Sequence, residues 1–262
     1  MKVLVCLKRV PDTSEAELKL GSAGKNVDLT GLKFELNDTD NYALEEAIKI
    51  KEATGGEAVA VVIGSQEEEV MIRTALAKGC DSAVRIDPAN FDAKGDPLQV
   101  VSILAAAIQG REYDLVLTGC MASDDGFMAV GVALAEELGI AHAAMVNRIE
   151  LAEGRVKVQR ELEGGLGEVV DIALPAVLTI QTGINKPRYP GLKGVKAAQK
   201  KEIKAVTLED IGLNAAELDH GLRVELRRFY IPEVVSHAEV ITGAPEAKAE
   251  ILADKLIKGG LA

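Results

Sequence analysis

The sequence contains very few aromatic residues: four Phe, four Tyr and no Trp among 262 residues. A folded core must therefore be built almost wholly from Ala, Val, Leu and Ile. Scarce aromatics also disfavour a stacking surface for single-stranded nucleic acid. A net charge of −11, from 41 acidic and 30 basic side chains, further argues against a protein that binds a phosphate backbone through clustered Lys and Arg.

Cysteine is scarce as well, and long apolar runs are missing. Cys6, Cys80 and Cys120 are an odd number, lie far apart and form neither a CxxC pair nor a His–Cys spacing suited to zinc. We therefore expect three reduced thiols and no metal site. No run of 18 apolar residues occurs, and the first apolar run is too short and too soon charged for a signal peptide, so we expect a cytoplasmic protein without a membrane span.

Candidates for catalysis are equally few. His142, His220 and His237 stand in no ligand-like spacing. The adjacent carboxylates of Asp124 and Asp125 could separate in pKa for acid–base work, but two such neighbours in a loop more often cap a helix, bind ribose or are solvated. We expect no catalytic side chains.

The first two-thirds of the chain alternate strand-like apolar runs with helical patterns. This alternation predicts an α/β fold with a doubly wound, mostly parallel sheet covered on both faces. Ser65 with Glu68 predicts a capping box, and Asp96 followed by Pro97 predicts an N-cap and first helical position. The predicted strands are 2–7, 58–63, 83–86, 115–117 and 174–180, and the predicted helices carry Leu44 to Ile48, Ile72 to Leu76, Leu104 to Ile108 and Val130 to Leu138.

The texture changes from about Met145 to short runs with turn signals. Val156–Val158 and Val169–Ala173 flank Gly164-Gly165, which predicts an antiparallel hairpin added to the sheet rather than a dinucleotide fingerprint. Residues 186–204 then carry seven basic side chains and one acidic one. Beyond this segment, weak periodicity precedes an amphipathic helix that starts near Pro245, a pattern typical of a partner-docking arm, with an ordinary subdomain as the alternative.

Three parts are therefore predicted: an α/β domain over 1–184 that binds a nucleotide, a basic segment over 185–204, and an arm over 205–262. In doubly wound sheets the carboxyl ends of the strands and the N-termini of the following helices form the ligand crevice, where free backbone N–H groups attract phosphate. The strands that end near Cys6, Ile63 and Gly119 mark this crevice.

Several ordered segments resemble the β subunit of the electron transfer flavoproteins. The run VQRELEGG over 158–165, followed by Glu168 and by LPAVLT over 174–179, is similar to the signature of that family. Segments 2–12, 43–47, 73–77 and 185–189 match the family in the same order. The resemblance covers nearly the whole chain to about residue 204 and is weaker beyond it.

The resemblance implies an electron carrier subunit rather than an enzyme. It implies a fold like that of the adenine-nucleotide α-hydrolases and a heterodimer with a larger α subunit, which the C-terminal arm contacts. FAD shared with that subunit would accept electrons from an acyl-CoA dehydrogenase or a related flavoenzyme and pass them on. The β subunit would also bind AMP. The alternatives are an electron-bifurcating relative, with a second FAD in place of AMP and NADH as donor, or a stand-alone adenine-nucleotide-binding protein.

The resemblance also implies two sets of site residues. The family usually offers Asn and Thr side chains to the phosphate where this sequence has Met128 and Val130, so backbone donors are left there. Leu192 corresponds to an exposed leucine that enters an apolar pocket of the dehydrogenase. The remaining recognition residues are Arg188, Tyr189, Lys193 and Lys196, and the nucleotide site comprises Cys6, Asn37, Asp38, Thr39, Asp40, Ile63, Gly119, Cys120, Met121, Ala122, Ser123, Asp124, Asp125, Gly126, Phe127, Met128, Ala129 and Val130.

Overall fold

The computed structural model describes residues 1–21, 24–88, 96–220, 223–233 and 238–261. The chain divides into two units, Met1–Arg228 and Phe229–Ala262. The first unit contains the sheet and its covering helices, and the second contains α7 (Pro245–Lys258). The helix expected near Pro245 is confirmed, with the proline in its first turn.

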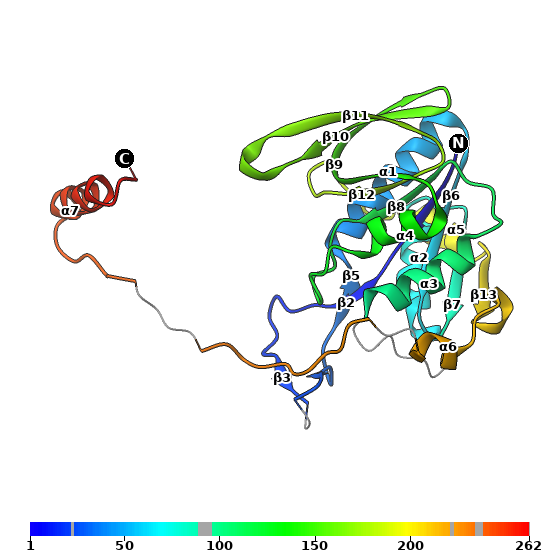
Figure 1. The fold of residues 1–262 in the computed structure, drawn as a ribbon, viewed down its shortest axis with the longest axis horizontal. Coiled ribbons are helices and arrows are strands. Elements are labelled where there is room, and N and C mark those ends of the chain that lie inside the picture. Colours follow the sequence, from blue (N-terminus) through cyan, green and yellow to red (C-terminus); the bar gives the residue numbers. More distant parts are fainter. Residues whose placement is uncertain (22–23, 89–95, 221–222, 234–237, 262) are drawn as a thin grey trace. The chain divides into compact units, whose positions relative to one another are not determined.

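Nine strands form one sheet in the described part of the first unit, in the order β11-β10-β9-β12-β8-β1-β6-β7-β13 (Figure 1). Neighbours from β9 to β13 pair in parallel, whereas β10 pairs with β9 and β11 in antiparallel fashion. The predicted mostly parallel sheet with an added hairpin is therefore confirmed. The strands are β1 (Lys2–Cys6), β6 (Glu57–Ile63), β7 (Ser82–Asp87), β8 (Leu115–Gly119), β9 (Ala141–Ala152), β10 (Arg155–Glu161), β11 (Gly167–Ala173), β12 (Ala176–Ile180) and β13 (Ile203–Thr207).

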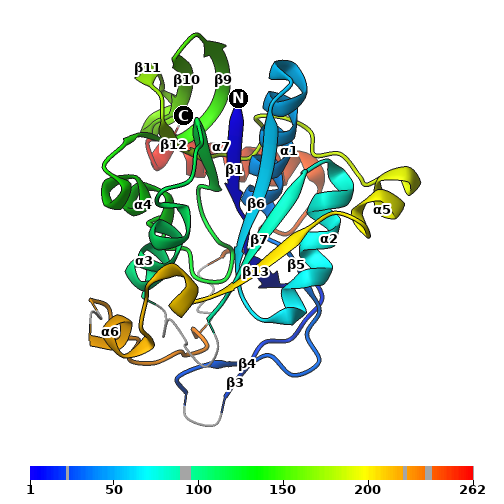
Figure 2. The same ribbon diagram turned by 90° about the vertical axis from the view of Figure 1, so that its right-hand side faces the viewer.

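Helices cover both faces of this sheet. Figure 2 shows α1 and α2 on one side and α3 and α4 on the other. Side chains alternate along the strands, so Val3 and Val5 join the core on the first side while Leu4 and Cys6 join the core on the second. The helices are α1 (Asp38–Thr54), α2 (Glu69–Lys78), α3 (Pro97–Ile108), α4 (Val130–Leu138), α5 (Leu192–Ala198) and α6 (Ala215–His220).

The buried apolar side chains match the composition. They are Ala, Val, Leu and Ile, joined by Met71 and the three cysteines, and no aromatic ring is among the buried side chains of the described residues. The expectation of an almost wholly aliphatic core is confirmed.

The two helix starts predicted from sequence differ in outcome. Asp96 accepts a hydrogen bond from the Leu98 N–H at 2.9 Å, as expected of an N-cap before Pro97. The Ser65 hydroxyl accepts from the Glu67 N–H at the 3₁₀ turn Gln66–Glu68, ahead of α2. The predicted capping box is wrong in both halves: the Ser65 hydroxyl accepts from the N–H of Glu67 and not from that of Glu68, and the Glu68 carboxylate pairs with the Arg9 guanidinium at 2.9 Å.

Part of the segment that sequence patterns place in an arm belongs to the sheet. β13 pairs in parallel with β7, crossing the boundary expected at residue 205. Leu208 and Leu218 are buried in the same core, and the first unit runs to Arg228. The paired short strands β2 (Arg9–Pro11) with β5 (Phe34–Leu36) and β3 (Lys19–Leu20) with β4 (Val27–Asp28) were likewise not predicted.

The aliphatic core generates a stability prediction. Leu117 lies in the centre of β8 with no exposed surface, so Leu117→Ala should lower the free energy of unfolding by about 2–5 kcal/mol. Urea denaturation followed by circular dichroism measures this loss. Leu166→Ala is the matched control, because 66% of that leucine is exposed in the hairpin, and its effect should stay within about 0.5 kcal/mol. Equal losses in the two variants would contradict the assigned core.

Candidate functional site

Three strand ends lie side by side at the carboxyl edge of the sheet. β1 ends at Cys6 and pairs in parallel with both β6 and β8, which end at Ile63 and Gly119. The strand order reverses here, because β6 and β7 follow β1 on one side and β8 lies on the other. Ligands of doubly wound sheets bind at such a switch point.

A buried carboxylate joins two of these strand ends. Asp40, in the first turn of α1, accepts hydrogen bonds from the Lys8 N–H just beyond β1 at 2.8 Å and from the Gly119 N–H at the end of β8 at 3.0 Å. Only 7% of Asp40 is exposed, and this burial raises its pKa to about 7 against the opposing effect of its hydrogen bonds. A Cβ at Gly119 would lie 2.2 Å from Asp40 Oδ1, so only glycine allows this close approach.

The same end of α1 holds the loop that follows β8. The side-chain Nδ2 of Asn37 donates to the Met121 carbonyl at 2.9 Å, and the Thr39 hydroxyl donates to that carbonyl at 2.6 Å. The side-chain Oδ1 of Asn37 accepts from the Ser123 N–H at 3.1 Å. Residues 37–40 and 119–123, which the resemblance placed in one site, are therefore in direct contact.

Lys8 is a site residue that the sequence analysis did not single out. Its ammonium group lies 2.7 Å from Asp124 Oδ1 and 2.8 Å from Asp125 Oδ2. Burial by itself would lower the pKa of Lys8, but the two carboxylates raise it above its ordinary value. One ammonium thus binds both acidic side chains of the loop, an interaction that was not among the alternatives weighed from the sequence.

The loop leads into α4 through backbone conformations that favour glycine. Gly126 has a φ of +67° and Met128 a φ of +55°. Ala129 then stands at the N-cap, where it makes no side-chain hydrogen bond to the helix. The first N–H groups of α4 therefore have no side-chain cap, a setting that suits an anionic group.

A second glycine allows α4 to start close to the sheet. A Cβ at Gly131 would lie 2.4 Å from Thr179 Cγ2 and 2.5 Å from Thr118 Oγ1. Without that Cβ, the start of α4 lies against the ends of β8 and β12, beside the loop at the carboxyl edge.

The other predicted site residues lie along the same edge, where the Phe127 N–H donates to Asp125 Oδ1 at 3.1 Å and the Cys120 thiol lies 3.7 Å from Gln181 Oε1. Cys6 is buried, and burial together with the nearby Asp40 raises the pKa of its thiol to about 12, while burial also raises that of Cys120. Phe127 and Met128 expose apolar surface at the rim. Asp38 and Ala122 also lie in this region, on α1 and on the loop.

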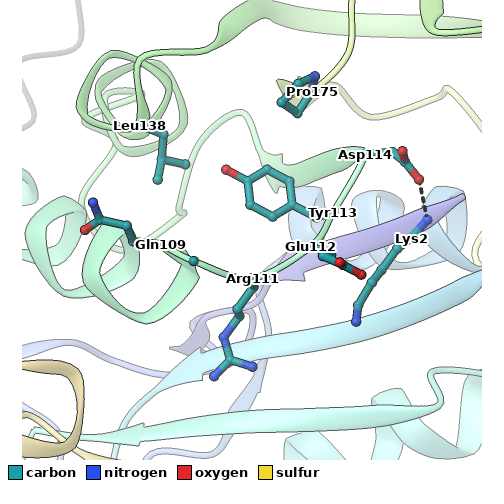
Figure 3. A pocket seen from close by; sticks show the side chains of 9 residues that line it. Lys2, Gln109, Arg111, Glu112, Tyr113, Asp114, Leu138 and Pro175 are labelled. Atoms are coloured by element: carbon teal, nitrogen blue, oxygen red, sulfur yellow. Dashed lines mark hydrogen bonds between the residues drawn. The ribbon is translucent and has the colours of Figure 1, made fainter.

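A separate cavity of about 580 Å³ lies at the opposite edge of the sheet (Figure 3). It is lined by Lys2, Arg111, Tyr113 and Pro175, and the Lys2 N–H donates to Asp114 at 2.7 Å. Lys2, Tyr113 and Pro175 lie at or before the first residues of parallel strands, whereas the predicted site lies where such strands end. The cavity therefore includes none of the predicted site residues.

The predicted recognition residues fall into two groups. Tyr189 is 94% exposed and Leu192, the first residue of α5, is 85% exposed, with Lys193 and Lys196 exposed beside them. Arg188, the remaining predicted recognition residue, forms ion pairs through its guanidinium with Glu45 and Glu52 of α1. The distances are 2.9 and 2.6 Å.

Two further observations concern metals and membranes. Within the described ranges, no three His, Cys, Asp or Glu side chains gather closely enough to hold a metal ion. No helix in the same ranges combines the length and apolar character needed to cross a bilayer.

The fold and this edge define an α/β protein with a helix-covered, mostly parallel sheet and a polar site at the ends of its central strands. A sequence model described as the electron transfer flavoprotein domain matches residues 26–211. Electron transfer flavoprotein subunit beta of Methylophilus methylotrophus is 41% identical over 240 residues, 89% of each chain. The Bacillus subtilis subunit is 33% identical over 98% of this chain and 97% of its own, and the human subunit is 34% identical over 82% and 84%.

This chain therefore belongs to the electron transfer flavoprotein family, among the β subunits. The resemblance carried by the hairpin segment 158–165 and its companion segments is confirmed. Membership in this family supports electron transport and association with a flavin and an α subunit.

The buried carboxylate generates a prediction about pH. The pKa of Asp40 is about 7 in the folded chain against an ordinary value of 3.8, so the folded chain holds this proton more tightly. The contribution of this proton to the free energy of unfolding is fully present below pH 4, and the free energy of unfolding falls as the pH rises through 7. Asp40→Asn, which cannot ionise, should remove this fall, as measured by urea denaturation at intervals from pH 4 to pH 8.

Asp210→Asn is the control, because that carboxylate is exposed and the hydrogen bonds at Thr207 lower its pKa. It should leave the fall between pH 4 and pH 7 in place. An unchanged slope in Asp40→Asn would show that the ionisation of Asp40 is not coupled to folding.

Proposed function

We propose that this chain is the β subunit of a heterodimeric electron transfer flavoprotein that carries electrons rather than catalysing a reaction of its own. The observation that carries the proposal is the 41% identity to a β subunit over 89% of both chains. FAD shared with the α subunit supplies the electron-accepting chemistry when bound. The cytoplasm is the proposed compartment.

The site at the carboxyl edge fits a subunit without acid–base catalysis. The Asp40 carboxylate accepts two backbone hydrogen bonds, and Asp124 and Asp125 share the Lys8 ammonium, so these groups are occupied in holding the loop. The role of this chain is then to bind and orient, and to supply a fixed electrostatic surrounding.

We place AMP at this edge. The uncapped start of α4 offers backbone N–H groups to a phosphate, and this supports an AMP phosphate at that position. The backbone groups are needed because the side chains of Met128 and Val130 are apolar. Asn37 and Thr39 hold the loop in place from the other side. The apolar ends of the strands at Cys6 and Ile63 are suited to the adenine ring.

The exposed segment around α5 is the proposed contact with the electron donor, an acyl-CoA dehydrogenase or a related flavoenzyme. Leu192 offers an apolar side chain to a pocket of that partner, and Lys193 and Lys196 beside it steer an acidic surface towards it. The arm that contains α7 is proposed to dock on the α subunit. A row of apolar side chains, Ile251, Leu252, Leu256 and Ile257, stays exposed along that helix.

The nucleotide proposal is tested by composition. The heterodimer purified after co-expression with its α subunit should release one FAD and one AMP per dimer, as counted by chromatography after denaturation. Asn37→Ala removes the side-chain hydrogen bonds to the Met121 carbonyl and from the Ser123 N–H, which leaves Thr39 as the remaining side chain of this turn bonded to the loop. This variant should lose most of its AMP and keep its FAD. Asn214→Ala, which removes an exposed hydrogen bond to the Ala216 N–H, is the control and should keep both nucleotides.

Two FAD per dimer would contradict the AMP assignment and favour the electron-bifurcating form. A protein that binds adenine nucleotide without α subunit or flavin would contradict the carrier proposal as a whole.

The recognition proposal is tested by kinetics. Leu192→Ala removes most of an apolar anchor. In an assay in which an acyl-CoA dehydrogenase, reduced by its acyl-CoA substrate, passes electrons to the heterodimer, the KM for the heterodimer should rise about tenfold. The flavin content should not change. Leu29→Ala, at another exposed leucine, is the control and should leave the KM as it is. The same KM for Leu192→Ala and the unmodified protein would remove Leu192 from this role.

A further inference from the structure

The segment over 185–204 is attached at its beginning to α1. The side-chain Nδ2 of Asn185 donates to the Tyr42 carbonyl at 3.0 Å and to Glu46 Oε2 at 2.9 Å. Arg188 then binds Glu45 and Glu52 on the same helix. The chain is therefore held up to residue 188, immediately before the exposed Tyr189.

The end of the segment is attached to α2 by two cationic side chains, one from each partner, that donate to backbone carbonyls of the other. Arg73 of α2 donates from Nη1 to the carbonyls of Ala198 and Lys201, at 2.7 and 2.8 Å, where α5 ends. Lys201 donates in return to the carbonyls of Leu76 at 3.0 Å and Cys80, where α2 ends. The last carbonyls of a helix lack partners within the helix, and a cation there is favoured by the helix dipole.

The contact between α5 and α2 leaves no room for a side chain on one face of α5. A Cβ at Gly194 would lie 2.2 Å from the Ala77 carbonyl oxygen. Ala198, one turn further on, is 1% exposed. Residues four apart share a helix face, so Gly194 and Ala198 form the face in contact with α2, whereas Leu192 and Lys196 share another face, exposed to solvent.

A helix of seven residues does not hold its own shape in water, since isolated helices shorter than about 12 residues are marginal. The direction in which Leu192 points therefore depends on how α5 is fixed to α2. Among the contacts described, Arg73 is the side chain of α2 that reaches both carbonyls at the end of α5.

We propose that Arg73 is a positioning residue for partner recognition: it fixes α5 on α2 and so presents Leu192 in one orientation to the electron donor. The inference rests on the proposed function of Leu192. The guanidinium of Arg73 is bound to carbonyls of this chain, so Arg73 acts through α5 rather than by touching the donor. A contact that is already ordered costs less conformational entropy when the partner binds.

The test uses the flavin-loaded heterodimer and the same acyl-CoA dehydrogenase assay. Arg73→Gln cannot donate two charge-assisted bonds, so the KM for the heterodimer should rise about tenfold while kcat stays within twofold. Trypsin cleavage after Lys193 and Lys196 should be faster in this variant. Arg73→Lys keeps a cation near both carbonyls and should recover most of the KM and of the trypsin resistance.

Two controls separate positioning from charge. Lys200→Gln removes one positive charge beside α5 without touching α2, so its KM shows how much steering alone contributes. In a Leu192→Ala background, Arg73→Gln should raise the KM no further, because the side chain that it positions is gone.

The outcomes are distinguishable. If Leu192→Ala raises the KM and Arg73→Gln does not, the positioning role is overturned and the proposed function stands. If Leu192→Ala itself has no effect, the recognition proposal fails. Should Arg73→Gln not fold, Gly194→Ala forces α5 away from the Ala77 carbonyl while Arg73 itself stays in place, and an unchanged KM in that variant would overturn the inference.

Discussion

The buried Asp40 carboxylate is the interaction on which the carboxyl edge of the sheet depends. It accepts the backbone N–H groups beyond β1 and at the end of β8, the two strands between which the chain order reverses. Its neighbours Asn37 and Thr39 hold the following loop from the same helix turn. One turn of α1 thus fixes two strand ends and the approach to α4, and the cost of burying the carboxylate is visible in a pKa of about 7.

The charges of this chain are unevenly distributed, because a basic segment lies within a protein whose net charge is −11. Of the seven basic side chains between residues 186 and 204, Arg188 is paired with two carboxylates and Lys201 with two carbonyls. These cations fix the segment instead of facing outwards. The charges left for steering lie around the exposed Leu192, which makes that leucine the centre of the proposed contact surface.

Local patterns predicted most strands of the sheet, though not β9, because apolar runs such as 58–63 and caps such as Asp96 depend on nearby residues. β13 could not be found in this way: it is a short edge strand whose Lys204, Ala205 and Thr207 are exposed, and its pairing with β7 joins residues more than 100 apart. The same holds for Lys8, whose partners at Asp124 and Asp125 are distant in sequence. Resemblance placed residues 37–40 and 119–130 in one site, but the bonds between them come from the tertiary structure.

The measurement that tests the central claim most directly is the flavin absorbance of the α subunit prepared with and without this chain, followed in a stopped-flow mixer against a reduced acyl-CoA dehydrogenase. The account predicts a yellow heterodimer whose absorbance near 450 nm is bleached on mixing, and little or no such signal when this chain is omitted. Equal bleaching in its absence, or a heterodimer without flavin, would contradict the assignment as an electron-carrying β subunit.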